Sequence, residues 1–418
     1  MAEFSIVGAG ALLCSGKCAY CSATSVQDVD FKGKNIKKED FGKVIWDWDA
    51  VKKVFDTNHI IQDAIKNGST LTLNFWSAEP LDFYKEANEY FTWVQKNYPK
   101  LKFQAFISTN GIPFARKKVQ DWIYEAHRKW GLKLQLSHDG VGQHVRTRTY
   151  DPLYDERTKD FIVKLVKDKI LDMINCTLNG INYSPFANKL YFDKWRFDNH
   201  IETIPMLIKL NHNNDAEYTG PYKLKGEPLK RYMHEMEMLM QQSALVQGNN
   251  SFQMVGVYGG WPHQALETLQ NQMNVQKQLW QPYAGYLANQ MNRFDYFKQW
   301  GGCAQYSLGI TNETWCINTK GEYVFCQLCN DPEDNPNQKL ERPEHCKDCE
   351  FRDYNECFPC PDMVFADECE YKKEYMRLML RMKQYLHIIH SFSQVMEATV
   401  SEKEKGTCSC NNRGEKRC

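Results

Sequence analysis

Three cysteines near the start of the chain have the spacing of a metal-binding loop. Cys14, Cys18 and Cys21 form a C-x3-C-x2-C segment directly after an apolar run that predicts a first strand. A cubane of four irons needs four ligands, so a cluster held by these three thiolates would keep one iron open. The open iron could chelate an amino and a carboxylate group, as the methionine part of S-adenosylmethionine would allow. A zinc knuckle is the alternative, but no histidine or further cysteine lies nearby in the sequence to complete it.

A second group of nine cysteines lies between Cys303 and Cys369, enough for two four-cysteine clusters with one left over. The nine are Cys303, Cys316, Cys326, Cys329, Cys346, Cys349, Cys357, Cys360 and Cys369. Two zinc ribbons are the alternative, because C-x2-C pairs alone do not distinguish zinc from iron–sulfur. Cys176 lies in an apolar run and is expected to be a buried core thiol.

The first half of the chain alternates short apolar runs with amphipathic stretches, which is typical of strand–helix units and a parallel sheet. The predicted strands are Phe4–Leu13, Thr70–Trp76, Lys102–Ser108, Leu132–Ser137, Leu171–Leu178 and Ile201–Ile208. The predicted helices between them are Asp49–Lys66, Tyr84–Asn97, Arg116–Lys129 and Thr158–Lys169. This order predicts an α/β fold, a partial or full barrel whose active site lies at the carboxyl ends of the strands.

The second half divides into three predicted parts. Residues 211–300 are rich in Asn, Gln, Met and Trp, with a helix expected at Leu229–Gln242, and form either a bridge or a substrate-specific region. Residues 301–375 hold the second cysteine group, and residues 376–418 complete a helix at Tyr371–Phe392 followed by a disordered tail. The barrel itself would then occupy residues 1–210.

Composition narrows the classes of partner. Lys plus Arg equal Asp plus Glu at 52 each, which predicts no general attraction to nucleic acid or to an anionic membrane. No apolar run reaches the roughly 18 residues of a membrane helix, and Glu3 precedes the first run where a secretory signal carries basic residues. We therefore expect a cytoplasmic protein.

The first cysteine loop resembles the signature of the radical S-adenosylmethionine superfamily, including the aromatic Tyr20 before the last cysteine. Residues 75–81, FWSAEPL, are similar to the glycine-glycine-glutamate-proline motif after strand two, with Ser77 and Ala78 in place of the glycines. The resemblance implies that Glu79 receives the amino group of S-adenosylmethionine.

Two further motifs follow the next strands in the order that the superfamily shows. Residues 108–111, STNG, resemble its Thr-Asn-Gly turn, and residues 136–140, LSHDG, resemble its Ser-Leu-Asp-Gly motif. The resemblance implies that Ser137 and Asp139 lie near the cofactor ribose and that Arg146 pairs with the cofactor carboxylate.

The second cysteine group resembles the SPASM domain, which binds two auxiliary clusters. The spacings from Gly321 to Cys326 and from Cys346 to Cys349 match its pattern. Seventeen residues separate Cys303 from Gly321, seven separate Cys349 from Cys357 and two separate Cys357 from Cys360, so ligand order is kept while loop lengths differ. By resemblance, one cluster would take Cys303, Cys316, Cys326 and Cys360, with Cys316 preferred to Cys329. The other would take Cys346, Cys349, Cys357 and Cys369.

These resemblances imply a peptide-modifying enzyme with three [4Fe-4S] clusters. It would cleave S-adenosylmethionine to a 5′-deoxyadenosyl radical that abstracts hydrogen from a peptide or protein, using an electron donor such as flavodoxin or ferredoxin. A small-molecule substrate and a non-catalytic metal-binding scaffold are the alternatives. Among relatives, sulfatase-maturing enzymes carry an aspartate that acts as a base directly after the cysteine corresponding to Cys326. This chain has Gln327 there, which cannot take up a proton at neutral pH, and this argues against formylglycine formation. Peptide natural-product maturases often carry a leader-binding domain ahead of the barrel, whereas strand one is expected here from Phe4.

Overall fold

The structure is a computed structural model. It describes residues 3–9, 11, 13–16, 18–20, 42–147, 150–204, 206–212, 221–247, 316–323, 347–351, 370, 373–378, 380–382 and 384–385. Within this part of the chain, no helix is long and apolar enough to cross a membrane.

The first half of the chain folds into a parallel sheet with helical crossovers, as the alternating pattern predicts, and one later strand joins the edge of this sheet. The strands are β1 (Glu3–Val7), β2 (Thr70–Trp76), β3 (Lys102–Thr109), β4 (Lys133–Ser137), β5 (Leu171–Leu178), β6 (Leu207–His212) and β7 (Cys316–Asn318), in the order β6-β5-β4-β3-β2-β1-β7. Every neighbouring pair is parallel. The predicted α/β partial barrel is confirmed.

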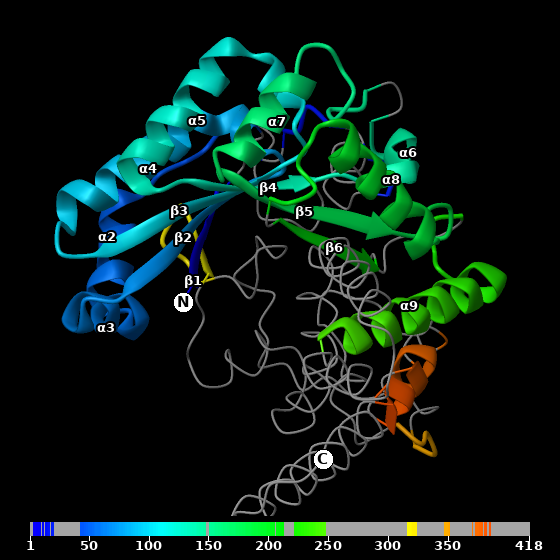
Figure 1. The fold of residues 1–418 in the computed structure, drawn as a ribbon. Helices are drawn as coiled ribbons and strands as arrows, with labels where there is room; N and C mark the ends of the chain where they lie inside the picture. Colours follow the sequence, from blue (N-terminus) through cyan, green and yellow to red (C-terminus); the bar gives the residue numbers. More distant parts are fainter. Residues whose placement is uncertain are drawn as a thin grey trace, which may run out of the picture.

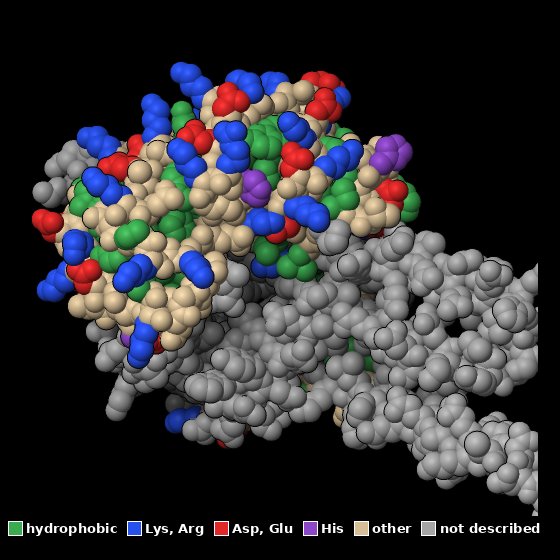
Figure 2. All heavy atoms as spheres, turned by 60° about the vertical axis from the view of Figure 1, so that its left-hand side comes forward, with side chains coloured by type: hydrophobic (Ala, Val, Ile, Leu, Met, Phe, Trp, Pro, Cys, Tyr) green, Lys and Arg blue, Asp and Glu red, His purple; other side chains and the backbone are tan. Residues whose placement is uncertain are grey.

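Helices connect the strands and cover one face of the sheet. They are α2 (Trp48–Thr57), α3 (His59–Asn67), α4 (Tyr84–Asn97), α5 (Lys117–Trp130), α6 (Gln143–Thr147), α7 (Lys159–Lys167), α8 (Pro185–Asp198) and α9 (Gly226–Gln247). Short 3-10 turns, η2 (Pro80–Phe83), η3 (Ile112–Ala115) and η4 (Gly140–Gly142), follow β2, β3 and β4. Figure 1 shows α4, α5 and α7 side by side on one face of the sheet. The face of the molecule drawn in Figure 2 carries many Lys and Arg side chains with fewer Asp and Glu among them.

The two faces of the sheet differ in polarity because side chains alternate along each strand. The helix-covered face is a continuous apolar core that includes Phe4, Ile6, Leu73, Ile107, Leu134, Ile174 and Cys176, all fully buried. This confirms Cys176 as a core thiol. The intervening positions include Ser5, Asn74, Gln135, Asn175 and Lys209. A polar inner face is what a barrel that receives a polar ligand requires.

Several element boundaries match the sequence prediction and others do not. Thr70–Trp76, Leu171–Leu178 and Tyr84–Asn97 agree with β2, β5 and α4. The single helix predicted at Asp49–Lys66 is wrong, because Asn58 is extended and its side chain accepts the first amide hydrogens of α3. The first strand is also shorter than predicted and ends at Val7.

The strand predicted at Ile201–Ile208 is wrong in position, since β6 begins at Leu207. The fully buried Arg196 of α8 donates to the carbonyl oxygens of Ile201, Glu202 and Ile204 at 3.4, 2.6 and 3.5 Å. Those carbonyls are satisfied by a guanidinium and not by a sheet neighbour, so the ladder starts later. The sequence prediction also missed α6, α8 and β7.

The later part of the chain is joined to the barrel through α9. Glu235 of α9 accepts hydrogen bonds from Ser184 Oγ at 2.6 Å and Phe186 N at 3.0 Å, at the start of α8. Arg381 in turn makes a bidentate ion pair with Glu237. The described residues between 373 and 385 are helical, in agreement with the helix predicted at Tyr371–Phe392, and the predicted tail lies outside the described residues.

Candidate cofactor site

Predicted site residues from four separate segments come together at the carboxyl ends of β1 to β4. Parallel strands end at the same edge, so the segments that follow them become neighbours. Cys14, Cys18 and Tyr20 follow β1, Glu79 follows β2, Asn110 follows β3, and Asp139 and Arg146 follow β4, of which Ser137 is the last residue.

Asp139 is the centre of this arrangement. Its carboxylate is fully buried and accepts from Arg146 Nη2 at 2.8 Å and from the Thr177 backbone amide at 3.1 Å, both on Oδ1. The Tyr20 hydroxyl donates to Oδ2. Burial raises the pKa of Tyr20 well above its usual value, which keeps the phenol protonated and able to donate. The carboxylate therefore ties the cysteine loop to β5 and α6.

The cysteine loop is held from two sides. Arg146 Nη1 lies 3.7 Å from Cys18 Sγ, and Asn110 Nδ2 lies 3.5 Å from Cys14 Sγ. The Gly16 amide also donates to Cys14 Sγ at 3.3 Å. A Cβ at Gly16 would lie only 2.8 Å from Asn110 Nδ2, so a larger residue there would push the Asn110 side chain aside. Donors that surround thiol sulfurs in this way stabilise metal-bound thiolates.

Glu79 is 1% exposed and accepts three hydrogen bonds, from Thr109 Oγ1 at 2.7 Å, Asn110 N at 2.7 Å and Leu81 N at 3.1 Å. Two of these fall on Oε1 and one on Oε2, so among the described residues Oε2 keeps capacity for a further donor. Burial raises the pKa of Glu79 to about 7, against the opposing effect of the Asn110 amide.

The turn that carries Asp139 rests on two asparagines that sequence reasoning missed. Asn182 Nδ2 donates to the Asp139 carbonyl at 2.8 Å, and Asn188 Oδ1 accepts the Val141 amide at 3.1 Å. The two side chains bond to each other at 2.8 Å. No local sequence motif predicts a role for these asparagines. They follow β5 and lie beside the Asp139 turn because β4 and β5 are neighbouring parallel strands.

The auxiliary cysteines are described only in part. Cys316 lies in β7 opposite Ser5, is buried, and packs against Val7 and Trp76. Cys349 is half-buried against the core. Cys21, Cys303, Cys326, Cys346, Cys357, Cys360 and Cys369 lie outside the described residues, as does Gln327. Among the residues that are described, no three His, Cys, Asp or Glu side chains gather as a metal site.

The site has polar atoms suited to a bound cofactor. Within the described part of the chain, Ser77 Oγ and Arg146 Nε are buried and have no hydrogen-bond partner. Buried polar groups in proteins are nearly always bonded, so donors without partners at one edge of the sheet fit a ligand with acceptor groups. The thiols of Cys14 and Cys18, each with an N–H donor at its sulfur, fit an iron–sulfur cluster at the same edge.

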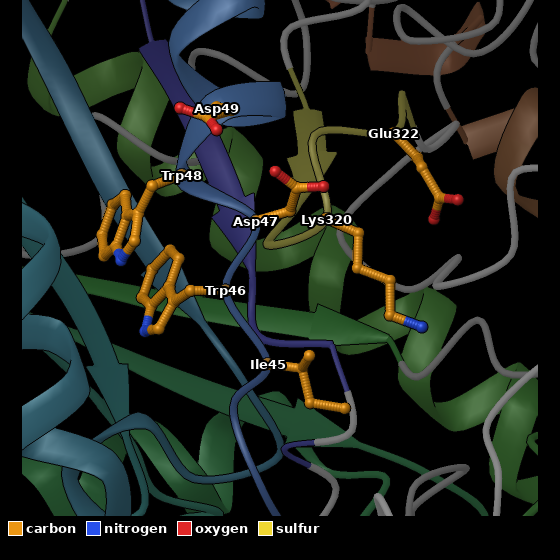
Figure 3. Close-up of a pocket in the computed structure, with 7 residues that line it drawn as sticks. All are labelled: Ile45, Trp46, Asp47, Trp48, Asp49, Lys320 and Glu322. Carbon is orange, nitrogen blue, oxygen red and sulfur yellow. The ribbon is translucent and has the colours of Figure 1, made fainter.

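A separate cleft of about 650 Å³ lies outside this site. Ile45, Trp46, Asp47, Trp48 and Asp49 line it from the segment that enters α2, and Lys320 and Glu322 line it from the turn after β7. Figure 3 shows the two indoles directed away from Lys320 and Glu322. Trp46 and Trp48 stack at 4.2 Å and pack toward the core, and no predicted site residue lines the cleft.

Comparison with solved structures identifies the fold. The chain is similar to native anSMEcpe with bound AdoMet and Cp18Cys peptide, with a TM-score of 0.53 and 12% identity over 93% of this chain and 99% of that one. It is also similar to anSMEcpe with AdoMet and Kp18Cys peptide, with a TM-score of 0.54, 12% identity and the same coverage. Native anSMEcpe with bound AdoMet is similar with a TM-score of 0.50 and 12% identity, over 93% of this chain and 100% of that chain. No family model matches the sequence, and no curated protein is similar to it. At this identity, the likeness shows that the chain has the fold of these structures.

Proposed function

We propose that this protein is a radical S-adenosylmethionine enzyme that modifies a peptide or protein. The observation that carries the proposal is the convergence of Cys14 and Cys18 with Glu79, Asp139 and Arg146 at one edge of the sheet. These residues come from the three segments that follow β1, β2 and β4, and a structural metal knuckle would not need Glu79, Asp139 or Arg146. The fold of anSMEcpe, whose structures hold AdoMet and peptides, supports the same reading.

The residues take distinct roles in this proposal. Cys14, Cys18 and Cys21 hold a [4Fe-4S] cluster, and Glu79 Oε2 accepts from the amino group of S-adenosylmethionine. Arg146 pairs with the cofactor carboxylate through a donor that Asp139 does not use, and Ser137 and Asp139 face the ribose. When bound, the reduced cluster supplies the electron that cleaves S-adenosylmethionine to a 5′-deoxyadenosyl radical.

The chain's own contribution is to orient the cofactor and to exclude water. Glu79 and Asp139 are buried, and each is held by three donors, so both are set before the cofactor arrives. Preorganised polar groups in a dry site avoid the cost of reorientation during the reaction.

The finer proposals concern the rest of the chain. Two auxiliary [4Fe-4S] clusters would use the cysteines of residues 301–375, and a flavodoxin or ferredoxin would supply electrons in the cytoplasm. The substrate would lose a hydrogen atom from a side chain or an α-carbon. The peptides in two of the similar anSMEcpe structures favour a peptide over a small metabolite here.

The test is anaerobic reconstitution followed by incubation with S-adenosylmethionine and a strong reductant. We expect brown protein with about three cubane clusters that produces 5′-deoxyadenosine. Replacing Cys14, Cys18 and Cys21 together by alanine should remove about a third of the iron and all cleavage. Zinc without iron after anaerobic purification would exclude the proposal. Deuterium transfer to 5′-deoxyadenosine from labelled candidate peptides, and not from labelled small metabolites, would support the substrate class.

A further inference from the structure

The turn that carries Asp139 contains a buried histidine with no role in the proposed cofactor contacts. His138 directly precedes Asp139 and is fully buried. Its ring stacks on Tyr191 at 5.6 Å between centroids and meets the edge of Phe192 at 5.8 Å. The imidazole therefore has one orientation, fixed by aromatic side chains of α8.

Both ring nitrogens of His138 are bonded, and the partners determine the tautomer. The Gly140 amide donates to Nδ1 at 3.0 Å, so Nδ1 carries no proton. Nε2 then donates to Asp151 Oδ1 at 2.8 Å. Asp151 is itself fixed, because it accepts from the Tyr191 hydroxyl at 2.6 Å and from the Leu153 amide at 3.0 Å. The acceptor lone pair of Nδ1 is thus directed at the Gly140 amide.

The bond from Gly140 to His138 closes the chain around Asp139. Gly140 has a φ of 55°, and a Cβ there would lie 2.1 Å from Asn188 Oδ1, so this position of the turn requires glycine. The Asp139 amide donates to Gln143 Oε1 at 3.0 Å on the other side. The bond from the Gly140 amide to His138 and the bond from the Asp139 amide to Gln143 therefore fix the backbone around Asp139. They hold its carboxylate in contact with Tyr20 and Arg146.

We propose that His138 is a positioning residue: by accepting the Gly140 amide, it holds Asp139 where the carboxylate binds Tyr20 and Arg146 and faces S-adenosylmethionine. The inference depends on the proposed function for the identity of the ligand, and only for that. The Asp151 and Tyr191 side chains act one step further away by fixing the proton on Nε2.

Two amide substitutions separate the two bonds of the ring. His138→Asn keeps an acceptor near the place of Nδ1, and His138→Gln keeps a donor near the place of Nε2. We expect His138→Gln to weaken S-adenosylmethionine binding to the reconstituted protein about tenfold, and His138→Asn to stay within about threefold of wild type. Amide hydrogen exchange of residues 139–147 in cofactor-free protein should accelerate in His138→Gln and not in His138→Asn. Tyr124→Phe, which removes a 2.6 Å bond from α5 to Asp168 at the end of α7, is the matched control and should change neither measurement.

The outcomes are distinguishable. Equal affinity and equal exchange in His138→Asn and His138→Gln would overturn the proposal. A loss of affinity that parallels the fall in thermal midpoint in both variants would also overturn it, because a residue that only packs behaves in this way. If His138→Asn lost affinity for S-adenosylmethionine and His138→Gln kept it, the effect would be due to the bond with Asp151. The bond from Gly140 would then be excluded as the cause. Wild-type protein that binds no S-adenosylmethionine would refute the proposed function, while the exchange comparison would still decide whether His138 holds the turn.

Discussion

Arg146 Nη1 lies 3.7 Å from Cys18 Sγ, so a cation that follows β4 touches a thiol that follows β1. The same guanidinium pairs with the fully buried Asp139 at 2.8 Å and is itself nearly buried. The cysteine loop and the segment that is proposed to receive the cofactor are therefore one hydrogen-bonded unit. Removal of one of these side chains is therefore expected to destabilise both the cysteine loop and the segment that carries Asp139 and Arg146.

Removal of Arg146 should expose the cost of an unpaired buried charge. We expect Arg146→Met to destabilise the protein by about 3 kcal/mol, because Asp139 would keep a negative charge with no partner cation. The double variant Arg146→Met/Asp139→Asn should be more stable than Arg146→Met alone, since the uncompensated charge is gone. Thermal midpoints of the three proteins measure this. A double variant no more stable than Arg146→Met would contradict the buried pair.

Glu79 makes stability depend on pH in a definite direction. Its folded pKa is about 7 against an ordinary value of 4.5, so its contribution to stability is fully present below 4.5 and is lost as pH rises toward 7. The loss corresponds to about 3 kcal/mol. Glu79→Gln has no charge to bury and should lack this part of the pH dependence. Denaturant titrations of ligand-free protein at pH 5 and pH 8 would show the difference, and identical curves for both proteins would contradict it.

The same carboxyl group should link cofactor binding to proton release. The amino group of S-adenosylmethionine favours ionised Glu79, so binding below pH 7 must expel the Glu79 proton and affinity should rise about fivefold between pH 6 and pH 7. Glu79→Gln should bind more weakly and lose this component. Calorimetry in two buffers of different ionisation enthalpy counts the protons. Equal proton release in both proteins would remove Glu79 from the binding step.

Asn110 should influence the electronic properties of a cluster at Cys14. Its side-chain amide lies 3.5 Å from the sulfur, and hydrogen bonds to cluster sulfurs are among the interactions that set reduction potential. We expect the Asn110→Ala variant to keep the bond from the backbone amide of residue 110 to Glu79 and to bind as much iron as wild type. The reduction potential of the cluster at Cys14 should fall. Potentiometric titration followed by electron paramagnetic resonance measures this. Asn97→Ala, which removes an exposed bond to Trp93 O, is the control and should leave the potential unchanged.

Local sequence determined the secondary structure wherever one periodicity dominated. The apolar run of Thr70–Trp76 agrees with β2, an interior strand, and the amphipathic stretch of Tyr84–Asn97 agrees with α4, whose apolar side is buried. Prediction failed where a single side chain outweighed the pattern. Asn58 splits a helix by capping the next one, and Arg196 takes the carbonyls that would otherwise have begun β6 earlier.

The motif resemblance also predicted Cys14, Cys18, Glu79, Asp139 and Arg146 as site residues, and their segments lie at one edge because parallel strands end there. Only the tertiary structure decided how these side chains satisfy one another. The pairing of Asp139 with Arg146 and Tyr20 depends on the register of separate strands, which no local pattern encodes. Asn182 and Asn188 take part for the same reason: their partners Asp139 and Val141 come from another crossover segment, and packing, not spacing along the chain, brings them within bonding distance.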